Sequence, residues 1–220
     1  MTGYRTKTQD IVVDGIATHI RSLLDRQQFS DPLGEAERAG ISSAAWPLFG
    51  LVWPSALVLA AHMEHVVFGE RQVLEVGCGL ALVSMAVQRR HGQITASDCH
   101  PLAESFLLEN LRLNDLAPLT YSRGDWTTAN PALGRFDLIV GSDVLYDRGQ
   151  PEQLSAFIEL HAEAAVEVII ADPDRGNRSA FNRRMDGLGY ERTELKVRVL
   201  PGGVIPYKGR LLSYRRAALS

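Results

Sequence analysis

The chain is poor in lysine and cysteine, and it has no long apolar run. Only three of its 220 residues are Lys, against twenty Arg, and the formal net charge is −3 at pH 7. That balance creates no overall positive field to attract nucleic acid or an anionic membrane. The longest apolar run is too short to cross a bilayer, and no signal-peptide pattern is present. We therefore expect a cytoplasmic protein that acts on neither partner.

The few candidate metal ligands do not form a pattern. Cys78 and Cys99 provide neither a disulfide framework nor the spacing of a zinc site. The six histidines are scattered, and only His62 and His65 lie three residues apart on an expected helix. No acid or cysteine completes a ligand set around them, so we expect no metal centre.

The length and the apolar content of 45% are typical of one globular domain with a sizeable core. Residues 1–45 are the least regular part of the chain. Within them, apolar and β-branched residues from Ile11 to Ile20 flank Asp14-Gly15, which predicts a β-hairpin. We therefore expect an N-terminal extension over residues 1–45 and a main domain over residues 46–220.

Strand and helix patterns alternate through the main domain. The expected strands cover residues 73–76, 94–97, 119–122, 136–141, 166–171, 191–200 and 210–216. The expected helices cover residues 55–68, 82–90, 101–114, 151–165 and 178–188. This alternation predicts an α/β fold, with a Rossmann-like, seven-stranded, mostly parallel sheet and helices on both faces. The last two strands predict an antiparallel hairpin at the C-terminus.

The first strand of this series ends in a glycine-rich loop. Gly77 and Gly79 allow backbone amides to approach a ligand closely, because neither residue carries a Cβ atom. Asp98 ends the next strand, 21 residues after Gly77. An acid at that offset lies beside the ribose of a nucleotide-like ligand and accepts hydrogen bonds from its hydroxyls. The segment therefore predicts an adenosine site.

The details of the loop favour one adenosine ligand. A dinucleotide loop needs a third glycine at the position of Leu82, and no phosphate-binding P-loop occurs elsewhere. The remaining pattern of Glu75, the two glycines and Ala81 suits S-adenosylmethionine, which has no phosphate groups. The ammonium and sulfonium of that ligand favour a nearby carboxylate, either Glu75 or Asp98.

Other residues of chemical interest follow the neighbouring strands, whose carboxyl ends form the ligand crevice in such a sheet. Trp126 offers a stacking face to a purine, and Asp125 an acceptor for its exocyclic amine. The alternative for Trp126 is a half-buried loop side chain. Trp53 precedes the first helix, where it either covers the same pocket or packs on the helix start.

A carboxylate and a phenol follow the most apolar strand, in the run Ser142-Asp143-Val144-Leu145-Tyr146. In a helical turn, Asp143 and Tyr146 would face the same way and form a cradle for a cationic amine. The alternative is a helix-capping aspartate beside a packed tyrosine. The run from Asp172 to Arg175 also follows a strand, and it either binds substrate or fixes its own turn.

Together these segments resemble the seven-β-strand methyltransferases, and most closely methyltransferase family 16, the protein-lysine group with an Asp-x-x-Tyr motif. The residues that carry the resemblance are the glycine loop, Asp98, Asp125-Trp126, the Asp143-to-Tyr146 motif and the Trp-Pro segment at Trp53-Pro54. The resemblance implies that Asp143 and Tyr146 line the methyl-acceptor channel. It also implies a set of contacts to S-adenosylmethionine: Trp53, Gly77, Cys78 through its backbone, Gly79, Asp98, Trp126 and Ser142. Ala81 departs from the family, since many relatives have a third glycine there.

The leading functional prediction is a monomeric S-adenosylmethionine-dependent N-methyltransferase that modifies lysine side chains of a protein. The same scaffold also serves arginine and small-molecule acceptors, and these alternatives stay open. An adenine-methylating nucleic-acid enzyme would carry Asn/Asp-Pro-Pro-Tyr where Ser142-Asp143-Val144-Leu145 stands. Leu82 disfavours an NAD-dependent oxidoreductase, and the Asp143/Tyr146 pair disfavours a non-catalytic binding module.

Overall fold

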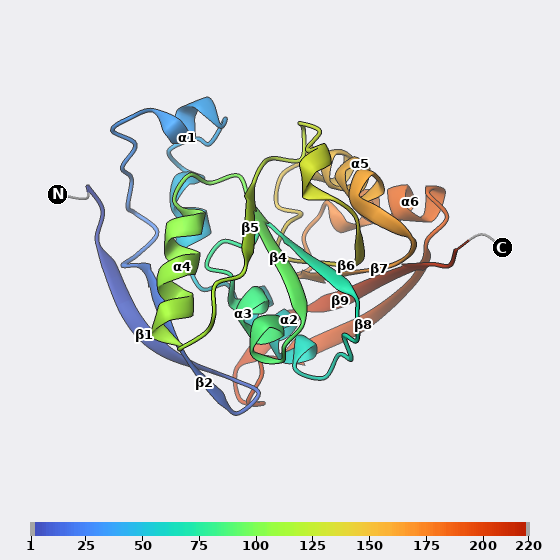
Figure 1. The fold of residues 1–220 in the computed structure, drawn as a ribbon, viewed down its shortest axis with the longest axis horizontal. Helices are drawn as coiled ribbons and strands as arrows, with labels where there is room; N and C mark the ends of the chain where they lie inside the picture. Colours follow the sequence, from blue (N-terminus) through green and yellow to red (C-terminus); the bar gives the residue numbers. More distant parts are fainter. Residues whose placement is uncertain (1–2, 219–220) are drawn as a thin grey trace.

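A computed structural model describes residues 3–218 and contains a seven-stranded sheet and a separate two-stranded hairpin (Figure 1). The strands are β1 (Thr6–Val13), β2 (Ile16–Leu23), β3 (Gln72–Val76), β4 (Gln93–Asp98), β5 (Thr120–Arg123), β6 (Phe136–Ser142), β7 (Ala162–Asp172), β8 (Glu191–Val199) and β9 (Pro206–Arg216). The helices are α1 (Glu35–Arg38), α2 (Pro54–Met63), α3 (Leu82–Arg89), α4 (Ala103–Leu113), α5 (Gln150–His161) and α6 (Arg178–Gly187), with 3₁₀ turns η1 (Trp46–Gly50) and η2 (Pro131–Leu133).

The large sheet has the strand order β5-β4-β3-β6-β7-β9-β8. Strands β3 to β7 pair in parallel, and β9 runs antiparallel to both of its neighbours. The expected fold class is therefore confirmed. The chain progresses outward from β3 to β5 and then returns to the other side of β3 with β6. This reversal opens a crevice at the carboxyl ends of β3 and β6, where ligands bind in doubly wound sheets.

The two faces of the sheet are covered by different helices. Alternate side chains along a strand point to opposite faces, so Val73 of β3 belongs to one core cluster and Leu74 to the other. The first cluster contains apolar side chains of α2, α3 and α4, and the second those of α5 and α6. Both faces of the central strands are thus buried, as their nearly continuous apolar sequences require.

The N-terminal hairpin packs against α4 (Figure 1). Asp14 and Gly15 both have positive φ, and Val13 pairs with Ile16 across the two-residue turn, as predicted. One asparagine in α4 and one at its C-terminal end bind the outer edge of β2. Asn110 Oδ1 accepts a hydrogen bond from Arg21 N at 2.8 Å, and Asn114 Oδ1 accepts one from His19 N at 2.8 Å. The division of the chain at residue 45 stays a prediction.

Two predicted helices were too long. α2 ends at Met63 rather than at residue 68, and Arg90, just after α3, donates to the carbonyl oxygen of Met63 at 2.7 Å. Residues 162–165 belong to β7 rather than to the preceding helix. The helix ends there because Ala162 is extended and its carbonyl accepts a hydrogen bond from Arg135 at 2.6 Å. In both cases the arginine that binds the end of the helix is distant from it in sequence.

None of the helices within residues 3–218 is both long enough and apolar enough to cross a membrane. Among the same residues, no group of three or more His, Cys, Asp or Glu side chains is arranged to hold a metal ion. His65, which was expected on the same helix as His62, lies beyond the end of α2 and contacts Asp14, with 2.8 Å between Nε2 and Oδ2.

We predict that Asn110→Ala lowers the free energy of unfolding by ~1–3 kcal/mol, because it leaves the Arg21 amide and the Leu80 carbonyl without their partner. Asn110 is fully buried, whereas Asn114 is only half-buried. Asn114→Ala is therefore the matched control and should cost less. Urea denaturation monitored by circular dichroism measures both values. Equal costs would show that the deeper burial of Asn110 does not determine the size of the loss.

Candidate functional site

The loop between β3 and α3 adopts a left-handed backbone at three alternate residues. Gly77, Gly79 and Ala81 have φ values of 60°, 53° and 60°. A Cβ atom on Gly79 would lie only 2.8 Å from the carbonyl oxygen of Phe49 in η1. A Cβ atom on Gly77 would lie 3.0 Å from Val144. The two glycines are therefore required both by the turn and by the close approach of neighbouring segments.

Hydrogen bonds attach this loop to the end of β4. Cys78 donates its backbone N–H to Ser97 O at 3.0 Å, and Gly79 donates to Asp98 Oδ2 at 2.8 Å. The other carboxylate oxygen of Asp98 accepts the His100 amide at 2.8 Å. Asp98 is buried, which raises the pKa of its carboxyl group, while the amide donors oppose that rise. A carboxylate has about four acceptor positions, so each oxygen retains a lone pair for a ribose hydroxyl.

Glu75 is buried beneath the loop. Its side chain is 1% exposed, and one carboxylate oxygen accepts hydrogen bonds from the backbone N–H and the hydroxyl of Ser84 in α3. Burial raises the pKa of this carboxyl group to about 8. The predicted cofactor contact of Glu75 remains untested, but the contacts observed here join β3 to α3.

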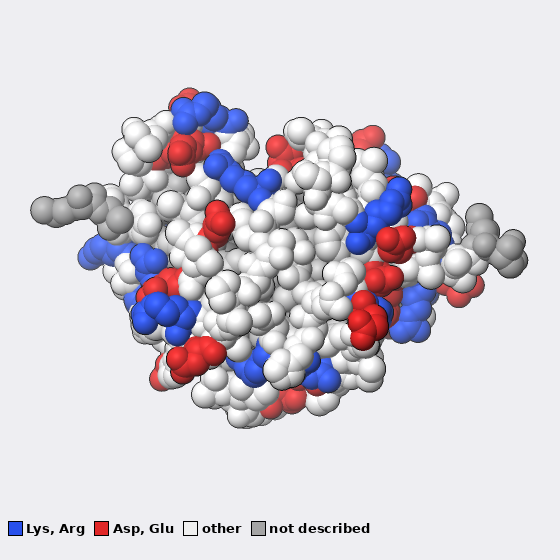
Figure 2. Space-filling view, viewed as in Figure 1, with Lys and Arg blue, Asp and Glu red and all other residues white. Residues whose placement is uncertain are grey.

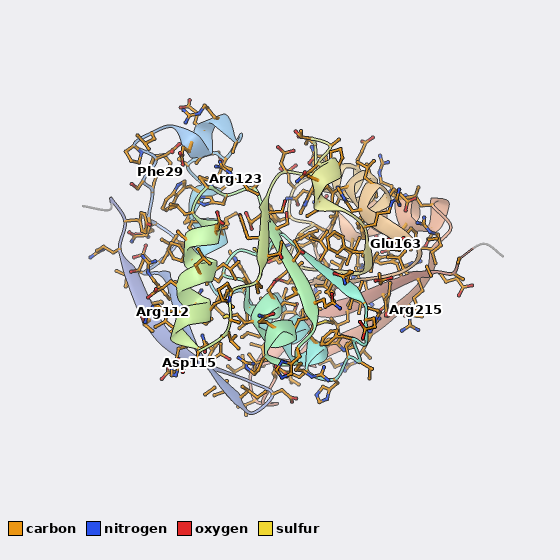
Figure 3. All side chains as sticks on the ribbon, in the orientation of Figure 1. Phe29, Arg112, Asp115, Arg123, Glu163 and Arg215 are labelled. Atoms are coloured by element: carbon orange, nitrogen blue, oxygen red, sulfur yellow. The ribbon has the colours of Figure 1, made fainter. Side chains whose placement is uncertain are left out.

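A cleft of about 430 Å³ lies at the carboxyl ends of β4 and β5, beside α1. Figure 2 shows this hollow, with basic side chains on its floor, and Figure 3 places Arg123 between α1 and the end of β5. The residues that line the cleft are Glu35, Arg38, Ala39, Cys99, Arg123, Gly124 and Asp125. Of these, the sequence singled out only Asp125 as a site residue. Cys99 and Arg123 were identifiable from their positions just after β4 and at the end of β5.

Asp125 and Trp126 lie between this cleft and the glycine loop. One oxygen of Asp125 accepts the backbone amides of Thr127 and Thr128 at 2.7 and 3.0 Å, and the Thr127 hydroxyl also donates to it. These hydrogen bonds lower the pKa of the Asp125 carboxyl group. The half-buried ring of Trp126 would lie 3.7 Å from a Cβ atom on Gly77. Trp126 is therefore adjacent to the loop, as the predicted stacking role requires.

The Trp-Pro segment lies on the opposite side of the loop. Trp53 is half-buried at the start of α2, and its indole N–H donates to Leu48 O at 2.8 Å. That hydrogen bond fixes the ring against η1, whose Phe49 carbonyl approaches Gly79. Phe49 is a site residue that the sequence analysis missed, because its contribution is a backbone contact. Ser142 lies half-buried at the end of β6.

The turn expected over Asp143 and Tyr146 is not helical. Asp143 has a φ of 54°, and its backbone N–H donates to Ala171 O at 2.8 Å. Its two carboxylate oxygens accept Nε and Nη2 of Arg175, both at 2.8 Å. The expectation that Asp143 and Tyr146 share a helical face is therefore wrong, because β7 and the loop after it hold Asp143 in place. The roles of both residues at the acceptor channel remain predictions.

Two tyrosines lie near this end of the crevice. Tyr146 is 52% exposed, so its ring is free to contact a ligand. Tyr207, at the start of β9, was not predicted. Its hydroxyl lies 2.8 Å from Ser55 Oγ in α2, and burial together with the nearby charge of Asp143 raises its pKa. No sequence signal identifies Tyr207, since 61 residues separate it from Tyr146.

These residues fit S-adenosylmethionine. The glycine loop has no room for a Cβ atom at Gly79, Asp98 lies beside it, and Trp126 packs close to Gly77. At the acceptor end, Asp143 and Tyr207 lie close enough to interact electrostatically. The nucleoside and the sulfonium of S-adenosylmethionine would therefore contact different groups of residues.

Comparison with known proteins decides the family. The model of the lysine methyltransferase family matches residues 43–186, which include the loop, Asp98 and Asp143. The chain belongs to this family. The resemblance inferred from the sequence is thereby confirmed, and the cofactor that the family indicates is S-adenosylmethionine.

The individual relatives share less than a third of the aligned residues with this chain. The electron transfer flavoprotein beta subunit lysine methyltransferase of Mus musculus is 27% identical over 152 residues, 67% of this chain and 59% of that protein. The chain thus spans a little more than half the length of the curated relatives it matches.

Solved structures of methyltransferases share the fold of this family member. The ribosomal protein L11 methylase of Lactobacillus delbrueckii has a TM-score of 0.57 and 18% identity, covering 74% of this chain and 79% of that one. The Thermus thermophilus 16S rRNA N2 G1207 methyltransferase, in complex with AdoMet and guanosine, has a TM-score of 0.65 and 16% identity. That match covers 96% of this chain and 51% of the rRNA enzyme. At these identities the likeness shows the fold and leaves the acceptor open.

We predict that Gly79→Ala destabilises the protein by more than the ~1–2 kcal/mol expected for an L-residue in a left-handed conformation. The additional cost comes from the Phe49 carbonyl, which the new Cβ atom would meet at 2.8 Å. Calorimetry should also show at least a tenfold loss of affinity for S-adenosylmethionine, because the loop has to shift.

Gly69→Ala is the matched control for this change. Gly69 has a φ of 57°, and nothing lies within 4 Å of a Cβ atom built on it. It should show the backbone cost alone and an unchanged affinity for the cofactor. If the two variants behave alike, the close contact between η1 and the loop has no role in binding.

The buried Glu75 predicts a particular pH dependence of stability. Its folded pKa of about 8 lies above the ordinary value of 4.5. Between these values the folded protein retains a proton that the unfolded chain has lost, so the free energy of unfolding falls as pH rises, by at most ~1.4 kcal/mol per pH unit. Glu75→Gln removes this contribution. Urea denaturation at pH 5, 6.5 and 8 should show the wild type losing stability relative to Glu75→Gln, and parallel curves would contradict the burial effect.

Proposed function

We propose that the protein is an S-adenosylmethionine-dependent N-methyltransferase that modifies lysine side chains of a protein acceptor. The observation that carries this proposal is the family match over residues 43–186, which spans an intact glycine loop and the two strand ends with Asp98 and Asp143. The glycine loop and Asp98 would hold the nucleoside. Asp143 and the tyrosines would border the acceptor.

S-adenosylmethionine supplies a methyl group activated by a positively charged sulfur. A lysine amine attacks only in its neutral form, and its ordinary pKa is ~10.4. The protein therefore has to favour loss of the ammonium proton to water and align the lone pair with the methyl group. Partial burial at the acceptor end contributes to the first requirement, because it disfavours a charged amine. Alignment is the larger part of such catalysis.

The charges at the acceptor end support lysine over arginine. A guanidinium stays protonated and is recognised best by a carboxylate with two free oxygens. Both oxygens of Asp143 already bind Arg175. Of the other acids near this loop, Asp147 accepts the Gly149 amide and Asp172 the Arg175 amide, through Oδ1 in each case. Asp143 is therefore already paired with a guanidinium of the protein, and one oxygen of each of the other two carboxylates already accepts a backbone amide.

The named relatives give a first candidate acceptor. They carry the name of the electron transfer flavoprotein beta subunit, so we propose a protein of that kind as the first acceptor to test. A monomeric state, a cytoplasmic location and the absence of nucleic-acid substrates remain predictions. Gel filtration, cell fractionation and labelling of purified RNA would test them in turn.

We predict that methyl label from S-adenosylmethionine appears on lysine when the protein is incubated with cell lysate. Acid hydrolysis of the labelled proteins, followed by amino-acid analysis, should yield methylated lysine in one or a few proteins. Asp98→Ala is the control and should abolish most labelling while retaining the circular dichroism spectrum, because it removes the acceptor beside the ribose. Label found chiefly on arginine, or only on small molecules, would refute the acceptor assignment.

A further inference from the structure

Arg175 covers the carboxylate of the acceptor site. The side chain of Asp143 is 9% exposed, whereas that of Arg175 is 41% exposed, so the guanidinium lies between the carboxylate and solvent. The pair is bidentate, with two N–O distances of 2.8 Å. Such parallel hydrogen bonds fix both position and orientation of the carboxylate. The charge that was expected to attract a cationic amine is thus already matched within the protein.

The loop that carries Arg175 is held at several points. The backbone N–H of Arg175 donates to Asp172 Oδ1 at 2.9 Å, and Asn177 Nδ2 donates to Leu145 O at 3.0 Å. Asp174 forms ion pairs with Arg178 and with Arg210, the latter at 2.8 Å. These contacts connect the loop to the segment after β6, to α6 and to β9. The backbone of Arg175 is therefore fixed by its neighbours, and its side chain is held by Asp143.

Without Arg175, the negative charge of the Asp143 carboxylate would oppose methyl transfer. A negative charge beside the acceptor stabilises the ammonium form of lysine, which has no lone pair to attack a methyl group. A carboxylate paired with a guanidinium has no net charge, and its oxygens still have free lone pairs that accept an N–H of a neutral amine. The other titratable or charged groups around the pair are Asp172, Asp174, Arg178, Tyr207 and Arg210.

We propose that Arg175 is a positioning residue of the acceptor site, which fixes the Asp143 carboxylate and cancels its charge so that the site accepts the neutral amine of lysine. This inference rests on the proposed function. In the transfer, the ammonium first loses its proton to water. The nitrogen lone pair then forms the bond to the methyl carbon while the carbon–sulfur bond breaks, its electron pair going to sulfur. The products are a methylated ammonium and S-adenosylhomocysteine.

The first test needs no acceptor. S-adenosylmethionine carries a sulfonium charge that S-adenosylhomocysteine lacks, so the ratio of their affinities reports the net charge near the sulfur. Calorimetry on Arg175→Gln should show that ratio at least threefold higher in favour of S-adenosylmethionine than in the wild type. The double variant Asp143→Asn/Arg175→Gln should return it to within about 1.5-fold of the wild type.

The second test measures kcat against pH with the acceptor protein found by lysate labelling. The rising limb of this profile reports the amine in the enzyme–substrate complex. It should move to higher pH by at least half a unit in Arg175→Gln, and the double variant should reverse the shift. Arg175→Lys keeps the charge but not the bidentate geometry, so it should retain the limb while lowering kcat.

Arg215→Gln is the matched control, since Arg215 is an exposed arginine near the C-terminal end of β9 (Figure 3) that pairs with Glu167 of β7, away from the loop after β7. This variant should change neither the ratio of the two cofactor affinities nor the pH of the rising limb. If the wild type methylates lysine but Arg175→Gln moves neither the affinity ratio nor the limb, the pair is only structural and this inference is overturned. A higher kcat in Arg175→Gln would overturn it as well. A wild type that binds no S-adenosylmethionine would instead refute the proposed function, and this inference with it.

Discussion

The crevice depends on one buried carboxylate. Asp98 accepts the amide of Gly79 through one oxygen and the amide of His100 through the other, so it joins the glycine loop, the end of β4 and the start of the next segment. Burial alone would make such a charge unfavourable, and the amide hydrogen bonds offset that cost. The amides of Cys78 and Gly79 are bound to the end of β4, which fixes the loop between its left-handed residues. Contacts within the protein thereby hold the cofactor end in place.

At the proposed acceptor end, charges of opposite sign are paired with one another. Arg175 binds Asp143 from the loop after β7, and Asp174 binds Arg178 and Arg210. These interactions attach the ends of β6, β7 and β9 to one another. Their consequence is electrostatic as well as structural, since an incoming side chain meets little net charge. A neutral amine crosses such a region more readily than an ammonium or a guanidinium, because charged groups lose more hydration free energy on burial.

The sequence predicted those features that depend on local pattern. The alternation of strands and helices led to the sheet, and Asp14-Gly15 led to the hairpin. Features that depend on distant partners were missed or assigned differently. Glu75 fits the spacing of a cofactor ligand but is buried against Ser84, and the backbone of Asp143 follows from β7 rather than from its neighbours in sequence. Tyr207 carries no sequence signal, because only the position of β9 beside β7 brings it to Asp143.

The family match covers the cofactor end of the crevice and only part of the proposed acceptor end. Residues 43–186 contain the glycine loop, Asp98 and Arg175, whereas Tyr207 and the strand β9 lie beyond the match. Tyr207 nevertheless reaches α2 through Ser55, so the acceptor end is built from both parts of the chain. The cofactor end has to satisfy one ligand, and its geometry is fixed by backbone contacts. The proposed acceptor end also uses the side chain of Tyr207, from a segment outside the match, so we expect changes in β9 to affect that end more than the loop or Asp98.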